Sequence, residues 1–159
     1  MRSLIYGYGD TGKSFERYLK NKKIDFHIFD ANIAEYNQNY NFQDFEQILC
    51  SPGIPKDIFE NIKSQNINTF TDVDIFFNED KSLKIGITGT NRKSTTAFHL
   101  HQLLNKYKPS NLVGNIGNTM LDFINNGKEF SIIELSSFQL DKMNQNRLDF
   151  GILLNIEDD

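Results

Sequence analysis

The feature that most constrains the fold is a pattern that occurs twice: a short apolar run, a glycine-rich turn and an amphipathic stretch. In the first copy the apolar run is 4–6, the turn is 7–12 and the amphipathic stretch is 13–22. In the second copy the apolar run is 83–88 and the turn is 89–93, and an amphipathic stretch follows. Short apolar runs joined by helices are typical of parallel sheets, because a parallel crossover needs a dozen or more residues. We therefore expect an α/β protein in which a strand–turn–helix unit begins twice.

The remaining runs extend this pattern. We expect strands at 26–30, 47–50 and 67–70, with Pro55 as the first residue of a helix, since proline suits that position. The polar segment 78–82 is the best boundary between two domains, 1–82 and 83–159, which the length of 159 residues allows. Beyond it we expect a turn at 114–117, a short helix near 120–124, a strand at 130–135 and a final apolar run at 151–156.

Composition limits the partners. The chain has 17 Lys and Arg against 21 Asp and Glu, a formal net charge of −4, so its overall field does not favour nucleic acid or an anionic membrane. Cys50 is the single cysteine, which excludes an internal disulfide and fits a reducing compartment. No run reaches the roughly 18 apolar residues of a membrane span. We expect a soluble cytoplasmic protein.

The first turn, Gly7-Tyr8-Gly9-Asp10-Thr11-Gly12, has the spacing G-x-G-x-x-G, and the acidic Asp30 follows about 20 residues later. Glycines let the backbone approach a phosphate, while the helix that follows offers amide donors and the positive end of its dipole. The motif indicates nucleotide binding. The same spacing also suits a tight turn that binds no ligand.

The second turn, Gly89-Thr90-Asn91-Arg92-Lys93-Ser94-Thr95, ends in the Lys-Ser pair of a phosphate-binding loop. In such loops backbone amides surround phosphate oxygens, the lysine contacts the β- and γ-phosphates, and the hydroxyl binds Mg²⁺. Ile87 and Arg92 stand where the general pattern has glycines. The change at Arg92 matters, because a residue with a Cβ adopts the usual backbone shape there only at a cost of about 1 kcal/mol or more.

A third candidate is Glu134, which ends the apolar run 131–133 and precedes two serines. Ligands of parallel sheets bind at the carboxyl ends of the strands, where a carboxylate can hold the Mg²⁺ of a bound nucleotide. Alone, Glu134 could equally be a solvated acid. Together with the phosphate loop it indicates a metal–nucleotide site.

Taken in order, these motifs resemble the Mur ligases of peptidoglycan synthesis, and within that family the branch that adds D-glutamate. The resemblance spans essentially the whole chain. The discriminating stretch is Glu-Leu-Ser-Ser-Phe-Gln-Leu at 134–140, because sister ligases carry other residues after the glutamate. The other matching segments are 7–14, Ser51-Pro52-Gly53-Ile54, 88–95 and Gly114-Asn115-Ile116-Gly117.

The resemblance implies a Rossmann-like N-terminal domain that holds UDP-N-acetylmuramoyl-L-alanine, followed by the first part of a P-loop ATPase domain that binds MgATP. The residues implied for the UDP-substrate are Gly9, Asp10, Thr11, Gly12, Asp30, Ser51, Pro52, Gly53, Asn115, Ser136 and Gln139. Those implied for ATP are Gly89, Thr90, Asn91, Arg92, Lys93, Ser94 and Thr95.

The implied reaction is ATP-dependent peptide-bond formation. The alanyl carboxylate attacks the γ-phosphate, and the amine of D-glutamate then attacks the acyl phosphate. Lys93, Glu134 and Asn115 would be the catalytic residues, and Ser94 and Glu134 would bind Mg²⁺. No nicotinamide is involved.

Two departures from the family qualify these expectations. Arg92 replaces a loop glycine, and the sequence stops at Asp159 before the histidine that follows the Asn-Ile-x-x-Asp motif in the family. We therefore expect the 159-residue chain to be catalytically inactive alone and to self-associate through an incomplete second domain. Two alternative hypotheses for the function are a dinucleotide-binding module of the NAD(P) type and a non-catalytic nucleotide-binding scaffold.

Overall fold

The computed structural model describes residues 2–116 and 118–157, and Gly117, the last residue of one predicted turn, lies outside them. Its contacts divide the described chain into two compact units: residues 2–75 with 142–144, and residues 76–141 with 145–157. The predicted domain boundary after Ser82 stays a proposal. None of the described helices is long and apolar enough to cross a membrane.

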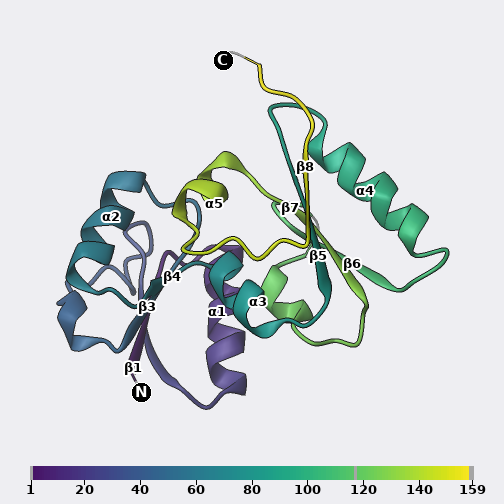
Figure 1. Ribbon diagram of the computed structural model, residues 1–159. Helices are drawn as coiled ribbons and strands as arrows, with labels where there is room; N and C mark the ends of the chain where they lie inside the picture. Colours follow the sequence, from purple (N-terminus) through teal and green to yellow (C-terminus); the bar gives the residue numbers. More distant parts are fainter. Residues whose placement is uncertain (1, 117, 158–159) are drawn as a thin grey trace. The chain divides into compact units, whose positions relative to one another are not determined.

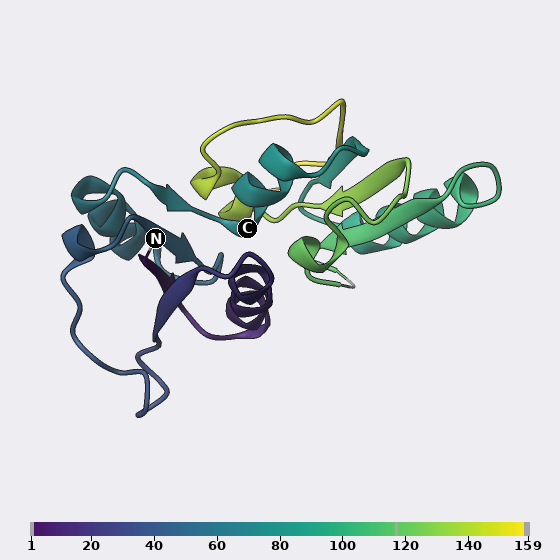
Figure 2. The same cartoon turned by 90° about the horizontal axis from the view of Figure 1, so that it is seen from below.

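The first unit is built on a four-stranded parallel sheet with strand order β2-β1-β3-β4. Figure 1 labels β1, β3 and β4 of this sheet. Helix α1 lies against β1, β2 and β3, as Figure 2, which looks nearly along α1, shows. The elements are β1 (Arg2–Tyr6), α1 (Asp10–Asn21), β2 (Asp25–Phe29), the 3₁₀ turn η1 (Phe42–Asp44), β3 (Gln47–Cys50), α2 (Lys56–Gln65), β4 (Thr69–Phe70) and the start of α3 (Asp72–Glu79).

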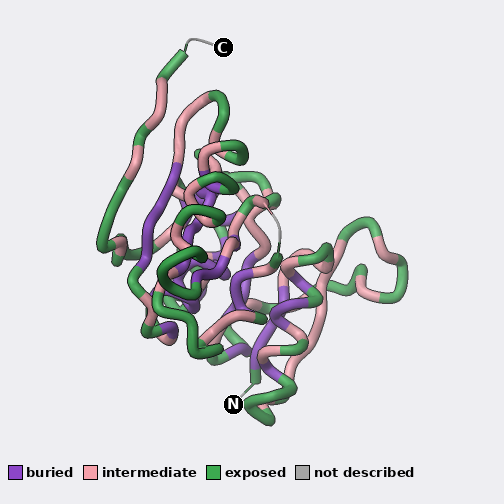
Figure 3. The backbone as a smooth tube through the Cα atoms, turned by 90° about the vertical axis from the view of Figure 1, so that its right-hand side faces the viewer, coloured by how far each residue is buried: buried purple, intermediate pink, exposed green. Residues whose placement is uncertain are grey.

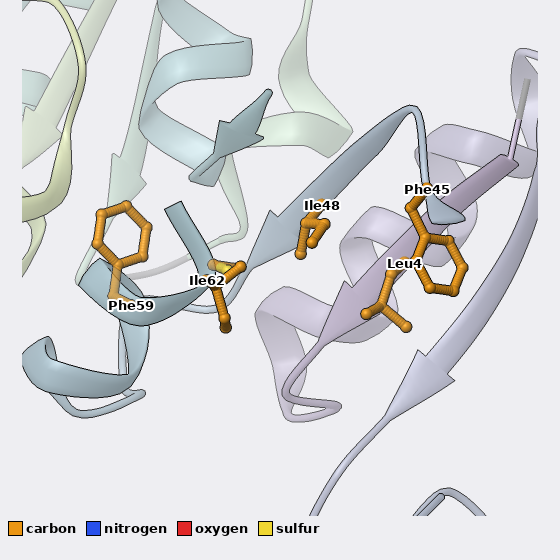
Figure 4. Packing of buried hydrophobic residues seen from close by; sticks show 6 residues of the cluster. Leu4, Phe45, Ile48, Phe59 and Ile62 are labelled. Carbon is orange, nitrogen blue, oxygen red and sulfur yellow. The ribbon is translucent and has the colours of Figure 1, made fainter. Parts of the chain in front are cut away.

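The core of the first unit forms where β1 and β3 run side by side. Leu4 pairs with Ile48 in the parallel register, and both side chains are fully buried. Phe59 and Ile62 of α2 join the same cluster, with Phe45 (Figure 4). Each fully buried side chain of this size contributes about 1.5–3 kcal/mol. Because this buried cluster fixes β1 and β3, it also fixes the positions of the loops that follow these strands.

Several element boundaries in the first unit differ from expectation; β1 begins at Arg2 rather than Leu4, and β2 runs from Asp25 to Phe29 rather than from Phe26 to Asp30. Helix α1 begins at Asp10 rather than Lys13, because Gly9 already serves as its N-cap. Pro55 is the N-cap of α2 and not its first helical residue. Ile67 is 85% exposed and outside β4, which is shortened because the side chain of Asn66 accepts the backbone N–H of Asn68.

The carboxyl group of Asp72, in the first turn of α3, gives a testable pH dependence. Asp72 is 5% exposed, and burial raises the pKa of its carboxyl from 3.8 to about 6. A carboxyl with a raised folded pKa contributes stability below its unfolded pKa and loses it as the pH rises through the folded pKa. We expect Asp72→Asn to raise the free energy of unfolding by about 1–2 kcal/mol at pH 7 and by under about 0.5 kcal/mol at pH 4.

Urea unfolding followed by circular dichroism between pH 4 and pH 7 measures this difference. Asp57→Asn is the control, since Asp57 is an exposed acid in the first turn of α2. An Asp72→Asn gain that is the same at both ends of the pH range contradicts the account.

The second unit has its own four-stranded parallel sheet, with strand order β6-β7-β5-β8 (Figure 1). Buried residues run along the two central strands, at 84–87 in β5 and 131–134 in β7, whereas the segment after β8 is partly or fully exposed (Figure 3). The elements are β5 (Leu83–Thr88), α4 (Lys93–Leu104), β6 (Ser110–Gly114), the 3₁₀ turn η2 (Met120–Phe123), β7 (Phe130–Glu134), α5 (Ser137–Lys142) and β8 (Phe150–Leu153).

Helix α4 covers part of this sheet, but fewer of its apolar residues are buried than the sequence suggests. Leu100 and Leu104 pack on the cluster of Ile87, Ala97 and Ile132, whereas Phe98 and Leu103 are 44% and 52% exposed. Strand β8 is an edge of the sheet and carries the exposed Phe150 and Leu153. Self-association of the chain through this edge stays a prediction.

Candidate functional site

The candidate substrate site of the first unit lies at the carboxyl ends of β1, β2 and β3. The Ser51 hydroxyl after β3 donates to the Gly7 carbonyl oxygen after β1, at 2.7 Å. The Asp30 carboxylate after β2 accepts the backbone N–H of Tyr8 at 2.7 Å and that of Asn32 at 2.9 Å. Three loops from separate parts of the chain are therefore held together. Asp30, predicted as a ligand-binding acid, also fixes the first glycine turn.

The backbone explains why two positions of this turn, Gly7 and Gly12, require glycine. Gly7 has φ +89°, a conformation that side chains disfavour. At Gly12, a Cβ would lie 2.2 Å from the Gly7 carbonyl oxygen. Gly12 thus allows the first turn of α1 to lie against the loop. The helix N-terminus then presents its amides and the positive end of its dipole beside the cavity.

A cavity of about 340 Å³ opens among these three loops. Gly53 and Ile54 also line a second cavity, of about 190 Å³, together with Phe29. Gly12, one of the predicted ligand residues, is buried and does not line the larger cavity. The predicted residues that do line it are Gly9, Asp10, Thr11, Asp30, Ser51, Pro52 and Gly53.

The phosphate loop of the second unit joins β5 to α4. Helix α4 begins at Lys93, whose ammonium donates to the carbonyl oxygens of Gly89, at 2.6 Å, and Thr90, at 3.0 Å. Asn155, after β8, braces the loop: its side-chain oxygen accepts the Asn91 N–H at 2.7 Å, and its carbonyl accepts the Thr90 N–H at 3.1 Å. No sequence pattern predicts a role for Asn155 in this loop, because its position across the sheet edge is set by the tertiary structure.

Arg92 is the N-cap of α4 and has φ +64°, in the left-handed region. This is the strain that its replacement of a glycine predicts. We expect Arg92→Gly to raise the free energy of unfolding of the second unit by about 0.5–1 kcal/mol, relief of the strain being partly offset by the greater freedom of glycine when unfolded. Urea unfolding followed by amide signals of this unit measures it.

Lys128→Gly is the control for that experiment. Lys128 is exposed in a loop of the same unit and is not among the described residues with positive φ. Glycine relieves no strain there, so we expect a small loss of stability. If the free energy of unfolding falls in both Arg92→Gly and Lys128→Gly, the backbone at Arg92 is not strained.

Glu134, the last residue of β7, is 2% exposed. Its Oε1 accepts the side-chain amide of Asn115 at 3.3 Å, and its Oε2 has no hydrogen-bond partner among the described residues. A buried carboxylate oxygen without a partner is costly, and a divalent cation would satisfy it. The donor set suits Mg²⁺, which takes one or two carboxylates together with nucleotide phosphates. Ser94, the other predicted metal ligand, is exposed in the first turn of α4.

Ser136 and Gln139 form a reciprocal cap at the start of α5. The Ser136 N–H donates to Gln139 Oε1 at 3.0 Å, and the Gln139 N–H donates to Ser136 Oγ at 3.3 Å. This is a capping box. Gln139 is 3% exposed, so this side chain, which the resemblance assigns to substrate, is used within the fold.

A cavity of about 470 Å³ lies over the phosphate loop and is also lined by Phe138 and Asn155. Of the predicted residues it is lined by Gly89, Thr90, Lys93, Asn115 and Ser136, whereas Asn91, Arg92, Ser94, Thr95, Glu134 and Gln139 lie outside the lining. A larger cavity, of about 610 Å³, is at the amino ends of β5 and β7 and contains none of the predicted residues.

In sequence, the chain is similar to curated ligases. It is 37% identical over 98% of its length to UDP-N-acetylmuramoylalanine--D-glutamate ligase of Francisella tularensis subsp. novicida, and 36% identical over the same share to that of Francisella tularensis subsp. tularensis. The chain spans 39% of the length of each of these relatives. No protein-family model matches it.

A solved structure shows the same fold. The crystal structure of UDP-N-acetylmuramate:L-alanyl-gamma-D-glutamyl-meso-diaminopimelate ligase from Neisseria meningitides matches with a TM-score of 0.60. The match covers 99% of this chain and 61% of that chain at 16% sequence identity. It confirms the predicted α/β fold with a Rossmann-like first part.

Proposed function

The chain is homologous to the Mur ligases over almost its whole length, and from this premise we propose that it provides the substrate- and ATP-binding loops of a UDP-N-acetylmuramoyl-L-alanine:D-glutamate ligase, a cytoplasmic enzyme. The observation that carries the proposal is the buried Glu134 Oε2, which has no hydrogen-bond partner within the part of the chain that the structure describes and lies at the sheet edge where the phosphate loop begins. A tight turn without a ligand gives no reason to bury such a group.

The first unit would bind the UDP portion of the substrate. The cavity bounded by the loops after β1, β2 and β3 offers the N-terminus of α1 to an anionic diphosphate. Asp30 is less suited to a nicotinamide dinucleotide, because both of its oxygens already accept backbone N–H groups. This supports the ligase hypothesis over the hypothesis of a dinucleotide-binding module.

The second unit would bind MgATP. The Lys93 ammonium donates hydrogen bonds to the carbonyl oxygens of Gly89 and Thr90. On ATP binding it would donate to phosphate oxygens instead, because these are stronger acceptors for a charged donor. Glu134 and Ser94 would hold Mg²⁺, which would neutralise phosphate charge. Asn115 fixes one oxygen of Glu134 and lines the cavity from the same sheet edge.

The reaction of the whole enzyme would join two anions that repel each other. The alanyl carboxylate oxygen would attack the γ-phosphorus, ADP would leave, and the D-glutamate amine would displace inorganic phosphate from the acyl phosphate, losing a proton as the amide forms. Lys93 would lower the cost of bringing the carboxylate to the phosphate. We propose that this chain alone binds without completing the ligation; phosphate release above background with all three substrates would contradict this.

Calorimetric titration of the 159-residue chain tests the binding role. We expect UDP-N-acetylmuramoyl-L-alanine and MgATP each to bind at a stoichiometry of one, and NADH to bind weakly or not at all. A folded chain that binds NADH more tightly than the UDP substrate favours the dinucleotide-binding module instead.

A further inference from the structure

Lys142, the last residue of α5, packs with the first unit and contacts one of its cavity loops. Its ammonium donates to the carbonyl oxygens of Pro52, at 2.6 Å, and Ile54, at 2.5 Å. Lys142 is 3% exposed, so the charged group is held away from water by these contacts. Burial raises the pKa of the nearby Cys50 thiol to about 12, which leaves that thiol neutral.

The Pro52 contact fixes the direction of a neighbouring amide. The C=O and N–H of a trans peptide unit point in opposite directions, so the N–H of Gly53 points away from the Lys142 ammonium. Gly53 lines both cavities of the first unit, and a Cβ there would meet nothing within 4 Å. The Lys142 contact thus sets the backbone direction of Gly53 where the loop borders open space.

The next residues of the same segment have a separate attachment. The Asn144 backbone N–H donates to Asp74 Oδ1 at 2.6 Å, and its side-chain amide donates to the Thr69 carbonyl at 2.9 Å. Asn144 therefore holds the segment to β4 and α3 without touching the 51–54 loop through these bonds. Lys142 and Asn144 offer a matched pair for separating loop geometry from stability.

We propose that Lys142 is a positioning residue for the UDP substrate: by holding the Pro52 and Ile54 carbonyls, it orients the Gly53 amide toward the anionic part of the ligand. This rests on the proposed function of the first unit. The buried cation also raises the positive potential of the loop, which favours a diphosphate.

The test uses UDP as the probe and the full chain, by calorimetry well below the unfolding midpoint. We expect Lys142→Met to weaken UDP binding about tenfold. The Gly53 amide resonance should shift and exchange faster in this variant. Asn144→Ala should lower the unfolding midpoint yet leave the UDP affinity within about twofold of the original chain.

Each outcome decides the proposal. Equal losses of affinity in the two variants assign Lys142 a merely structural role, and an unchanged affinity in Lys142→Met removes the role altogether. If Lys142→Met does not fold, Lys142→Gln, which keeps a neutral donor, should still weaken UDP binding, and Lys142→Arg should restore part of it. A folded original chain that binds no UDP overturns the proposed function of the first unit as well as this inference.

Discussion

Replacing Gly12 by alanine is expected to lower the free energy of unfolding of the first unit by about 3 kcal/mol or more. The added Cβ would lie 2.2 Å from the Gly7 carbonyl oxygen and 3.0 Å from its carbon, both backbone atoms that no side-chain rotation can move. The first turn of α1 must then separate from the loop after β1. Because that loop lines the cavity, UDP binding should weaken together with stability.

Gly9→Ala is the matched control in the same turn. A Cβ at Gly9 would meet nothing within 4 Å, and Gly9 has φ −75°, which alanine adopts freely. We expect a loss of no more than about 0.5 kcal/mol, since alanine caps a helix slightly less well than glycine. Urea unfolding followed by circular dichroism measures both variants. Similar losses for the two would show that the contact between Gly12 and Gly7 does not hold the turn.

The second large effect is expected for Glu134→Gln. In the original chain Mg²⁺ should tighten ATP binding about tenfold or more over binding in EDTA, equivalent to about 1.4 kcal/mol. The variant keeps the size of the side chain and an oxygen for Asn115 but loses the anionic oxygen that has no described partner. Its affinity with Mg²⁺ should therefore approach its affinity in EDTA. Titration of ATP in the two buffers provides the comparison.

Glu129→Gln provides the control from the other end of the same strand. Glu129 precedes β7, is exposed and pairs with Lys108 at 2.9 Å. An exposed pair of this kind contributes little, and it lies far along the strand from the phosphate loop. The Mg²⁺ effect should be unchanged in this variant. If Glu134→Gln keeps the full effect too, Glu134 does not bind the metal.

Sequence patterns predicted the fold best where apolar runs were continuous and ended in glycine or proline. The strands predicted at 47–50 and 83–88 coincide with β3 and β5. The first glycine motif and the phosphate loop also each follow a strand and run into the first turn of a helix, as their spacing predicts. In these segments local preference and burial agree, so the sequence alone is sufficient.

Other elements could not be predicted from sequence patterns, because tertiary contacts determine where they form. Strand β6 begins with two buried polar residues, Ser110 and Asn111. The Ser110 N–H donates to Asn105 Oδ1, and the Asn111 side-chain amide donates to Asn126 and Ser131. Helix α5 is six residues long and depends on its capping box more than on periodicity. Lys142 and Asn155 reach their loops from distant parts of the chain. No spacing rule predicts such contacts, and the roles of the site residues remain proposals.

The central claim is a division of labour between the two units, and amide NMR of the full chain tests it most directly. UDP-N-acetylmuramoyl-L-alanine should shift the resonances of residues 7–12 and 51–54 first, and MgATP those of residues 89–95. Saturation should be reached separately for each ligand. If the UDP substrate leaves the first-unit loops of a folded chain unperturbed, or if MgATP shifts them in place of the phosphate loop, the account is contradicted.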